Sequence, residues 1–585
     1  MPQASTARKP VKANKSSTPS MIHWRFLVVL FAVIIVFVCL AARAAFIQVI
    51  EPDRLIEQGD NRTIRVRDNP SYRGLITDRH GEQLAVSVPA RAIWADPKII
   101  HQHGALEDIR RWRALAEVLD TELDGLLDKV KNPKRRFVYI QRQVTPAMSN
   151  FVDELGIPGV YLRNESKRYY PTGEVSAHVV GFTDVDDKGL EGIERLYNEW
   201  LTGTPDKRRI RRDAKGRQVE IIDQTKGERA KDLSLTIDQR IQALAYREIK
   251  QATAYYQATS ASVIVVDVHT GEVLAMANTP SYNPNNRSSV SAHRLRNRAI
   301  TDAYEAGSSI KPLAVLAALE FGAVGPESKV DTSPGWMRLG GSRVSDPRNY
   351  GEISLAQIIQ KSSNMGTSKL ALSVPKNFLM DTYYNMGLMT DSGTNMVGES
   401  SGIFHERSRW SEHELAALSF GYNISVTTAQ LARMYTTIAN GGIKRPLSII
   451  KGNQNDALVE RVISEKNARA LIEMMESVTQ EGGSGTKAAI PGYRIAGKTG
   501  TSRKAFAGTY GEEYVNIFAG IAPVSDPQIV AVVLINEPGG DLYHAGDTAA
   551  PTFANIVAGS LQMLNVAPDE KTIVKNSQGV VYAAR

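Results

Sequence analysis

The chain has 585 residues, too many for one ordinary hydrophobic core, so about two to four domains are expected. Its 42% apolar and 23% charged residues exclude a wholly disordered chain. A net charge of +8 suits an anionic partner but is a mild excess for this length, and the one cysteine, Cys39, excludes intramolecular disulfides and zinc sites built from several thiolates.

The first element expected is a membrane anchor at residues 23–46. Residues 26–42 form an uncharged apolar run that would extend about 26 Å as a helix, close to a membrane span. Trp24, Arg25 and Arg43 flank this run, as residues at a membrane interface do. Residues 1–22 are polar and rich in Ser, Thr, Pro and Lys, and we expect a disordered cytoplasmic tail.

The charges before the anchor predict its orientation. They are all basic: Arg8, Lys9, Lys12, Lys15 and Arg25. The positive-inside rule then places the N-terminus in the cytoplasm and the rest of the chain outside it. A cleaved signal peptide with a small-residue site at 42–44 is the alternative, but the apolar run exceeds the usual signal core of about 7–15 residues. Both interpretations put the bulk of the chain outside the cytoplasm.

Two further domains are expected after the anchor. Residues 47–235 mix short strand-like pieces with charged turns and form a first domain. A basic cluster within it spans residues 207–217, and we interpret it as a solvated turn. The alternative is a contact with an anionic glycan or a partner protein. Residues 236–565 form the second domain, and residues 566–585 a C-terminal tail.

The second domain shows the periodicity of an α+β fold. Residues 261–267 and 272–277 are predicted as a strand pair joined by a turn at 269–271. Residues 308–321 are predicted as a helix that Gly322 ends, residues 515–521 and 529–535 as two more strands, and residues 549–564 as a closing helix. Strands at both ends with helices between them favour an antiparallel sheet flanked by helices.

Three short motifs in this domain carry the chemistry. In order they are Ser308-Ser309-Ile310-Lys311, Ser362-Ser363-Asn364 and Lys498-Thr499-Gly500-Thr501. This is the motif set of penicillin-binding proteins and class A β-lactamases. A serine hydroxyl is a poor nucleophile until a base removes its proton. Ser308 is the predicted nucleophile and Lys311, one helical turn away, the predicted base.

The other motif residues are predicted to serve the same reaction. A lysine acts as a base only when it is neutral, which requires burial or a nearby cation, and Lys498 is a candidate for that cation. Ser362 can relay a proton to the leaving nitrogen, and Asn364 can hold a peptide amide.

Lys498, Thr499 and Thr501 offer a cation and two hydroxyls for a terminal carboxylate, and Gly500 completes their motif. The backbone N–H groups of Ser308 and Thr501 would form the oxyanion hole.

Three other patterns compete with this interpretation. Residues 484–487 repeat the S-x-x-K pattern in a Gly-rich loop, where no helix would align the pair. Residues 492–499 match the phosphate-loop pattern of nucleotide hydrolases, but their interior favours a strand. His101 and His103 have no third ligand nearby in sequence, so no metal site is expected.

The chain resembles the class B penicillin-binding proteins along nearly its whole length after the anchor. Residues 304–312 (YEAGSSIKP) resemble the family's Y-x-P-G-S-x-x-K-P, with Ala306 in place of the usual proline. The first domain resembles the family's non-catalytic pedestal in Arg73-Gly74, Asp78-Arg79-His80-Gly81, Arg168-Tyr169-Tyr170-Pro171 and residues 189–194 (GLEGIE). Phe420-Gly421-Tyr422-Asn423 and residues 498–504 (KTGTSRK) favour the division branch over the elongation branch.

This resemblance implies a peptidoglycan D,D-transpeptidase of the inner membrane, with one transmembrane helix, a pedestal domain and a periplasmic transpeptidase domain. It implies that Ser308 attacks stem peptides ending in D-Ala-D-Ala and that β-lactams acylate it. It also implies partners among division proteins, including a membrane glycan polymerase, and no cofactor, metal or nucleic acid. The alternatives are an elongation-type enzyme, a D,D-carboxypeptidase, a β-lactamase and a catalytically inactive division scaffold.

Overall fold

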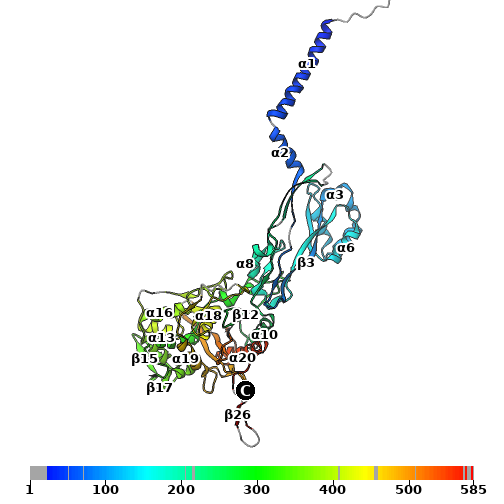
Figure 1. Cartoon of the computed structure of the whole chain (residues 1–585). Helices are drawn as coiled ribbons and strands as arrows, with labels where there is room; N and C mark the ends of the chain where they lie inside the picture. Colours follow the sequence, from blue (N-terminus) through cyan, green and yellow to red (C-terminus); the bar gives the residue numbers. More distant parts are fainter. Residues whose placement is uncertain are drawn as a thin grey trace, which may run out of the picture. The chain divides into compact units, whose positions relative to one another are not determined.

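The computed structural model describes residues 23–50, 52–69, 72–204, 206–213, 218–405, 407, 409–452, 459–506, 509–570, 573–575 and 581–583. The predictions for the tail at 1–22, for Lys215 and Arg217, and for most of the chain beyond residue 570 lie outside these residues. The chain divides into two compact units (Figure 1). The first comprises Met1–Pro70 and Pro205–Glu228, and the second comprises Ser71–Thr204 and Arg229–Arg585.

The first unit contains the apolar N-terminal helix. Helix α1 spans His23–Ala45 and continues as a π-helical turn over Phe46–Ile50. An 18-residue window within His23–Val49 has a mean hydropathy of 3.0 and none of it is buried, which suits a single membrane-spanning anchor. Helix α2 (Pro52–Thr63) leads into β1 (Ile64–Asn69).

A three-stranded antiparallel sheet completes this unit, in the order β1-β8-β9, with β8 over Asp206–Arg212 and β9 over Gln218–Thr225. The basic cluster was expected to be a turn, and that expectation is wrong for its described members. They form the central strand β8, because residues on both sides pair with it. Arg211 there lies 3.0 Å from Glu220 and 3.7 Å from Asp60, so part of the basic charge is neutralised within the unit.

The second unit begins with the pedestal sheet, in the order β10-β2-β3-β4, with β5 also paired to β3. Its strands are β2 (Ile76–Thr77), β3 (Gln83–Ala95), β4 (Val138–Val144), β5 (Val160–Tyr169) and β10 (Leu233–Ser234). One face of the β4-β3-β5 part is covered by α3 (Pro97–Gln102), α4 (Ile109–Val118), α5 (Leu123–Val130) and α6 (Pro146–Leu155). Ile93, Trp112 and Leu115 are fully buried in this core.

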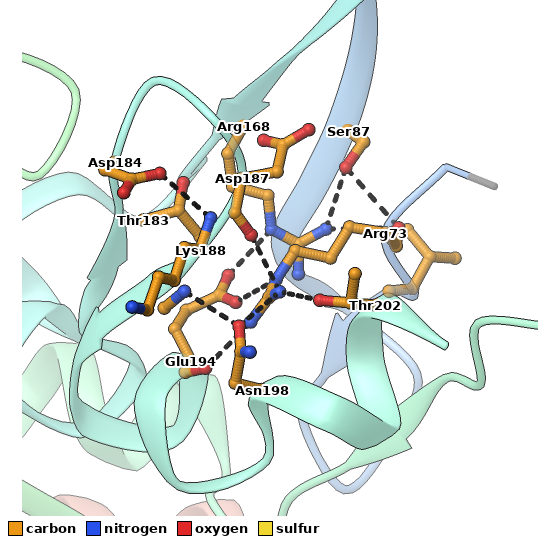
Figure 2. Close-up of polar contacts among 12 residues, drawn as sticks. Arg73, Ser87, Arg168, Thr183, Asp184, Asp187, Lys188, Glu194, Asn198 and Thr202 are labelled. Atoms are coloured by element: carbon orange, nitrogen blue, oxygen red, sulfur yellow. Dashed lines mark hydrogen bonds and ion pairs between the residues drawn. The ribbon is translucent and has the colours of Figure 1, made fainter. Parts of the chain in front are cut away.

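Three of the four pedestal motifs singled out in the sequence, those with Arg73, Arg168 and Glu194, meet in one buried ionic network (Figure 2). Glu194 accepts hydrogen bonds from Arg73 Nε at 2.5 Å and from Arg168 Nε at 2.7 Å. All three side chains are at most 2% exposed. Segments about 120 residues apart in the sequence are therefore tied together by charges that are costly to separate.

The domain that carries the three motifs is built on a five-stranded antiparallel sheet, in the order β12-β11-β24-β23-β22. These strands are β11 (Ser260–Asp267), β12 (Val273–Thr279), β22 (Ala496–Phe506), β23 (Thr509–Ala522) and β24 (Ile529–Asn536). Helices α10 (Gln239–Tyr255) and α20 (Ala549–Met563) pack with one face, and α18 (Thr428–Ala439) lies against β11 and β24. The predicted strands, the closing helix and the α+β class are confirmed.

The remaining elements complete the second unit and the described end of the chain. They are α7 (Ala177–Val180), β6 (Phe182–Thr183), β7 (Gly189–Glu191), α8 (Gly192–Leu196), α9 (Asn198–Thr202), α11 (Ala292–Leu295), α12 (Arg298–Thr301), β13 (Tyr304–Glu305), η4 (Gly307–Ile310), α13 (Lys311–Phe321), β14 (Lys329–Asp331), β15 (Trp336–Leu339), β16 (Ser342–Ser345), β17 (Glu352–Ser354), α14 (Leu355–Lys361), α15 (Asn364–Leu372), α16 (Lys376–Asn385), β18 (Ile403–Phe404), α17 (Glu412–Ser419), β19 (Ile424–Val426), β20 (Ile443–Lys444), β21 (Glu460–Arg461), α19 (Glu465–Glu476), β25 (Ile573–Lys575) and β26 (Val581–Ala583).

Candidate active site

Ser308 lies in the short 3₁₀ turn η4, which runs directly into α13. The single helix expected over 308–321 is therefore a 3₁₀ turn followed by an α-helix. Residues three apart eclipse in a 3₁₀ turn, so Ser308 and Lys311 lie on one face as expected. Pro312 falls in the first turn of α13, where a missing N–H costs nothing, and Gly322 ends the helix at φ 78°.

The turn before Ser308 is shaped by two glycines. Gly307 has φ 52°, in the left-handed region, and its N–H donates to the Gly421 carbonyl at 3.2 Å. A Cβ on Gly421 would lie 2.0 Å from the Gly307 carbonyl oxygen. Residue 421 must therefore be glycine for the 420–423 segment to support the serine turn. Ala306 has φ −63°, a value that a proline also adopts.

Lys311 is buried and points at the second motif. Its Nζ donates to the Ser362 carbonyl, to Ser362 Oγ at 3.1 Å and to Asn364 Oδ1 at 2.7 Å. The side chain is 1% exposed, and burial, followed by the charge of Lys498, lowers the pKa of Lys311 well below its ordinary value. Asp346 opposes this shift only in part.

Ser362 is held in place by the backbone between two helices. It adopts φ 56° at the C-terminus of α14, and Asn364 is the first residue of α15. The Asn364 side chain is engaged at both ends, because Oδ1 accepts from Lys311 and Nδ2 donates to the Ser345 carbonyl at 3.1 Å.

Asp346 is a site residue that sequence reasoning missed. Its carboxylate accepts from Ser363 Oγ at 2.5 Å, from Asn364 N at 2.6 Å and from Met365 N at 3.0 Å. A carboxylate at this position neutralises the N-terminal dipole of α15 and fixes the second motif. No local pattern marks Asp346, since it follows the β15–β16 hairpin and reaches α15 only through the tertiary fold.

The third motif lies on β22, the edge strand of the sheet. Lys498 is fully buried, and its Nζ donates to Ser362 Oγ at 3.1 Å and to the Thr499 carbonyl at 3.1 Å. Burial lowers the pKa of Lys498 to about 7. Two lysine side chains from different motifs therefore reach one serine hydroxyl.

Alternation along β22 divides the motif between two faces. A Cβ on Gly500 would meet the Ala306 carbonyl oxygen at 2.9 Å, so the glycine lets the strand approach the serine turn closely. Thr499 and Thr501 project the other way, where Thr499 Oγ1 meets Ser484 Oγ at 2.8 Å and Thr501 Oγ1 accepts from Ala545 N at 3.1 Å.

The residues of the competing patterns do not have the geometry that those patterns require. Lys487 of the second S-x-x-K pairs with Asp547 at 2.9 Å, whereas Ser484 contacts Thr499. Residues 496–499 of the phosphate-loop pattern lie within β22, where that loop would need the start of a helix. His101 and His103 lie at the end of α3, and no metal-binding group of three His, Cys, Asp or Glu occurs in the part of the chain that the structure describes.

Known proteins match this chain along almost its full length. Residues 261–558 match the penicillin binding protein transpeptidase domain and residues 68–235 the penicillin-binding protein dimerisation domain. The peptidoglycan D,D-transpeptidase FtsI of Escherichia coli K12 is 46% identical over 583 residues, covering 99% of this chain and 98% of the relative. The probable peptidoglycan D,D-transpeptidase PenA of Neisseria gonorrhoeae is 36% identical over 575 residues, covering 97% and 96%.

Solved structures agree with this match. Penicillin binding protein 3 of Mycobacterium tuberculosis, complexed with aztreonam, superposes with a TM-score of 0.66 at 27% identity, covering 89% of this chain and all of that one. The transpeptidase domain of penicillin-binding protein 3 from Burkholderia pseudomallei covers 57% of this chain and 98% of its own, with a TM-score of 0.53 at 36% identity. This chain belongs to the penicillin-binding proteins, in the branch of the FtsI-type peptidoglycan D,D-transpeptidases.

Proposed function

We propose that the chain cross-links peptidoglycan at the division septum through an acyl-enzyme on Ser308, with release of D-Ala. The observation that carries this mechanism is the convergence of Lys311 and Lys498, both buried, on the hydroxyl of Ser362, 3.1 Å from each. Burial and mutual repulsion favour the neutral form of Lys311, which is what a general base for Ser308 requires.

In the first step, neutral Lys311 accepts the Ser308 proton as Oγ attacks the penultimate carbonyl of a stem peptide. The backbone N–H groups of Ser308 and Thr501 stabilise the oxyanion. Ser362 passes the proton from Lys311 to the leaving nitrogen, because Ser362 Oγ already accepts a hydrogen bond from Lys311 Nζ. The peptide C–N bond then breaks and D-Ala leaves as an amine.

Substrate binding is assigned to the edge of β22 and to the second motif. The hydroxyls of Thr499 and Thr501, which share one face of β22, hold the terminal carboxylate, since each retains a rotatable proton to donate. The charge of Lys498 acts from the other face, where its Nζ lies 3.4 Å from Thr499 Oγ1. Asn364 binds a backbone amide of the donor peptide once that peptide competes with its contacts to Lys311 and Ser345. β-Lactams acylate Ser308 through the same contacts.

In the second step an amine from a neighbouring stem peptide attacks the acyl-enzyme and restores Ser308. Water in place of the amine would give a D,D-carboxypeptidase. The proposed layout is a cytoplasmic tail, an anchor in the inner membrane, a pedestal to about residue 235 and a periplasmic transpeptidase domain to about residue 565. Division proteins, including a membrane glycan polymerase, are the proposed partners of the pedestal.

The test is intact-mass spectrometry of the full chain in detergent after incubation with a penicillin, beside Ser308→Ala. One stable adduct on the wild type and none on a folded Ser308→Ala variant supports the proposal. A folded wild-type protein that forms no adduct overturns it. An adduct lost within seconds points to a hydrolase.

A further inference from the structure

An aromatic cluster lies on the open face of the pedestal sheet, opposite the helices α4 to α6. Trp94 on β3 is directly paired with Tyr139 on β4 and with Tyr161 on β5. Phe137, just before β4, stacks on Trp94 with ring centroids 4.9 Å apart. We call these four residues the aromatic platform.

The platform is a row of ring surfaces rather than a buried core. The rings of Trp94 and Tyr161 lie 4.8 Å apart at 31°, and Phe137 meets Tyr139 edge-on at 4.7 Å. Phe137 is 45% exposed and Tyr161 39%, while Trp94 and Tyr139 are half-buried. The neighbours Ile93, Ile140 and Leu162 point to the opposite face, into the helix-covered core. The rings are therefore held rigidly and still present area to a ligand.

Basic side chains border the platform. Arg142 lies over the Tyr139 ring at 4.8 Å and is neutralised by Glu165 and Asp186. Arg163 donates to the Tyr139 hydroxyl at 3.4 Å.

Lys134 and Arg135, three and two residues before Phe137, are exposed like Arg163, and none of these three cations has an ion-pair partner among the described residues. The rim of the platform is therefore net positive and is free to bind anions.

We propose that the aromatic platform is a second binding site for peptidoglycan, one that holds a glycan strand away from the active site. The apolar faces of sugar rings pack on aromatic rings, and the carboxylates of the attached stem peptides match the positive rim. This inference rests on the proposed function, because only a peptidoglycan enzyme would meet this ligand. An uncharged glycan would use only the aromatic rings of this surface, and a purely acidic protein would use only its basic rim.

The site would serve a polymerised substrate. A transpeptidase joins peptides on two strands, and holding one strand on the same molecule raises the effective concentration of its peptides. The gain needs only weak binding at each site, which suits a surface of four rings and three unpaired cations.

The test is co-sedimentation of the full chain in detergent with purified insoluble peptidoglycan, after Ser308 has been acylated with a penicillin. Acylation blocks the active site, so the remaining binding reports other sites. The double variant Phe137→Ala, Tyr161→Ala is expected to bind about tenfold more weakly. Its matched control is Tyr255→Ala, Tyr384→Ala, which removes two rings that are 75% and 54% exposed elsewhere.

A second pair tests the rim. Lys134→Ser, Arg135→Ser is expected to bind about threefold more weakly at low salt, a difference that shrinks as salt screens the charges. Its control is Arg110→Ser, Arg113→Ser on α4, which covers the opposite face of the sheet. Unchanged thermal stability and unchanged penicillin labelling show that each variant is folded and active.

Unchanged binding of the platform variants overturns the inference, as does wild-type binding that penicillin abolishes. Soluble glycan-peptide fragments should displace the wild-type chain. Displacement by polyglutamate or by phosphatidylglycerol vesicles as strongly as by these fragments would instead indicate an acidic partner or a lipid surface, and overturns the glycan assignment. Loss of the penicillin adduct from the wild type would refute the proposed function separately, since that signal does not depend on the platform.

Discussion

Gly500→Ala is the sharpest test of how β22 meets the nucleophile. The added Cβ would lie 2.9 Å from the Ala306 carbonyl oxygen, 3.1 Å from Ser309 Cβ and 3.2 Å from Ser309 N. Ordinary contacts begin near 3.4 Å, so the strand or the serine turn must move by about 0.5 Å. All three atoms belong to the serine turn, and none is the far end of a flexible side chain that could move aside.

The displacement falls on the two groups that must cooperate. In the proposed mechanism, Ser308 supplies the nucleophile and one oxyanion donor, and Thr501 supplies the other. Because a shift of about 1 Å can cost a hundredfold, half that shift is expected to lower the acylation rate by about tenfold, or about 1.4 kcal/mol in the barrier. The stability cost of such overpacking is about 1–3 kcal/mol.

The assay is stopped-flow acylation by a fluorescent penicillin, with thermal unfolding measured in parallel. The control is Gly325→Ala, whose added Cβ finds only Ser328 Oγ, at 3.9 Å. A folded Gly500→Ala variant that acylates at the wild-type rate would show that close approach of β22 does not set the catalytic geometry.

Three further predictions follow from the site and the pedestal. The acylation rate should rise with pH as Lys311 loses its proton. It should fall again above about pH 7 as Lys498 loses its proton, since the pKa of Lys498 is lowered to about 7. A Lys498→Arg variant that still acylates should lack this alkaline fall, and an identical fall would contradict the assignment. Ala306→Pro should raise the free energy of unfolding by about 0.4–1 kcal/mol, because the φ of −63° at residue 306 already suits proline and the preceding Glu305 lies in a strand. Urea unfolding measures this change, and a destabilised variant would show that the proline ring clashes with its surroundings. Glu194→Gln should cost about 3–5 kcal/mol in urea unfolding by leaving two arginines buried without a counter-charge, and a cost near zero would mean that water or Asp187 replaces it.

Local sequence determined most of the elements of the catalytic domain. The β-branched runs at 261–267, 515–521 and 529–535 are strands, and the apolar stretch ended by Gly322 is a helix. These elements were predictable because the spacing of apolar residues and a helix-ending glycine act within a few residues of the chain. The order and local context of the three motifs predicted that Ser308, Lys311, Ser362 and Lys498 form one site, and the structure brings Lys311 and Lys498 to the hydroxyl of Ser362.

The tertiary structure determined the burial, the neighbouring charges and the contacts of those residues. The depressed pKa of Lys311 arises from burial and from Lys498, which is distant in sequence and arrives on an edge strand. Asp346 and Ser484 join the site through contacts that no local pattern announces.

The same holds for the pedestal. The basic cluster was expected to be a turn and became a central strand, because pairing partners on both sides outweigh its polar composition. Trp94, Tyr139 and Tyr161 are scattered over about 70 residues and become one surface only through cross-strand register. Sequence patterns report the short-range preferences of a chain, whereas charge burial and ring stacking depend on which distant segments the fold brings into contact.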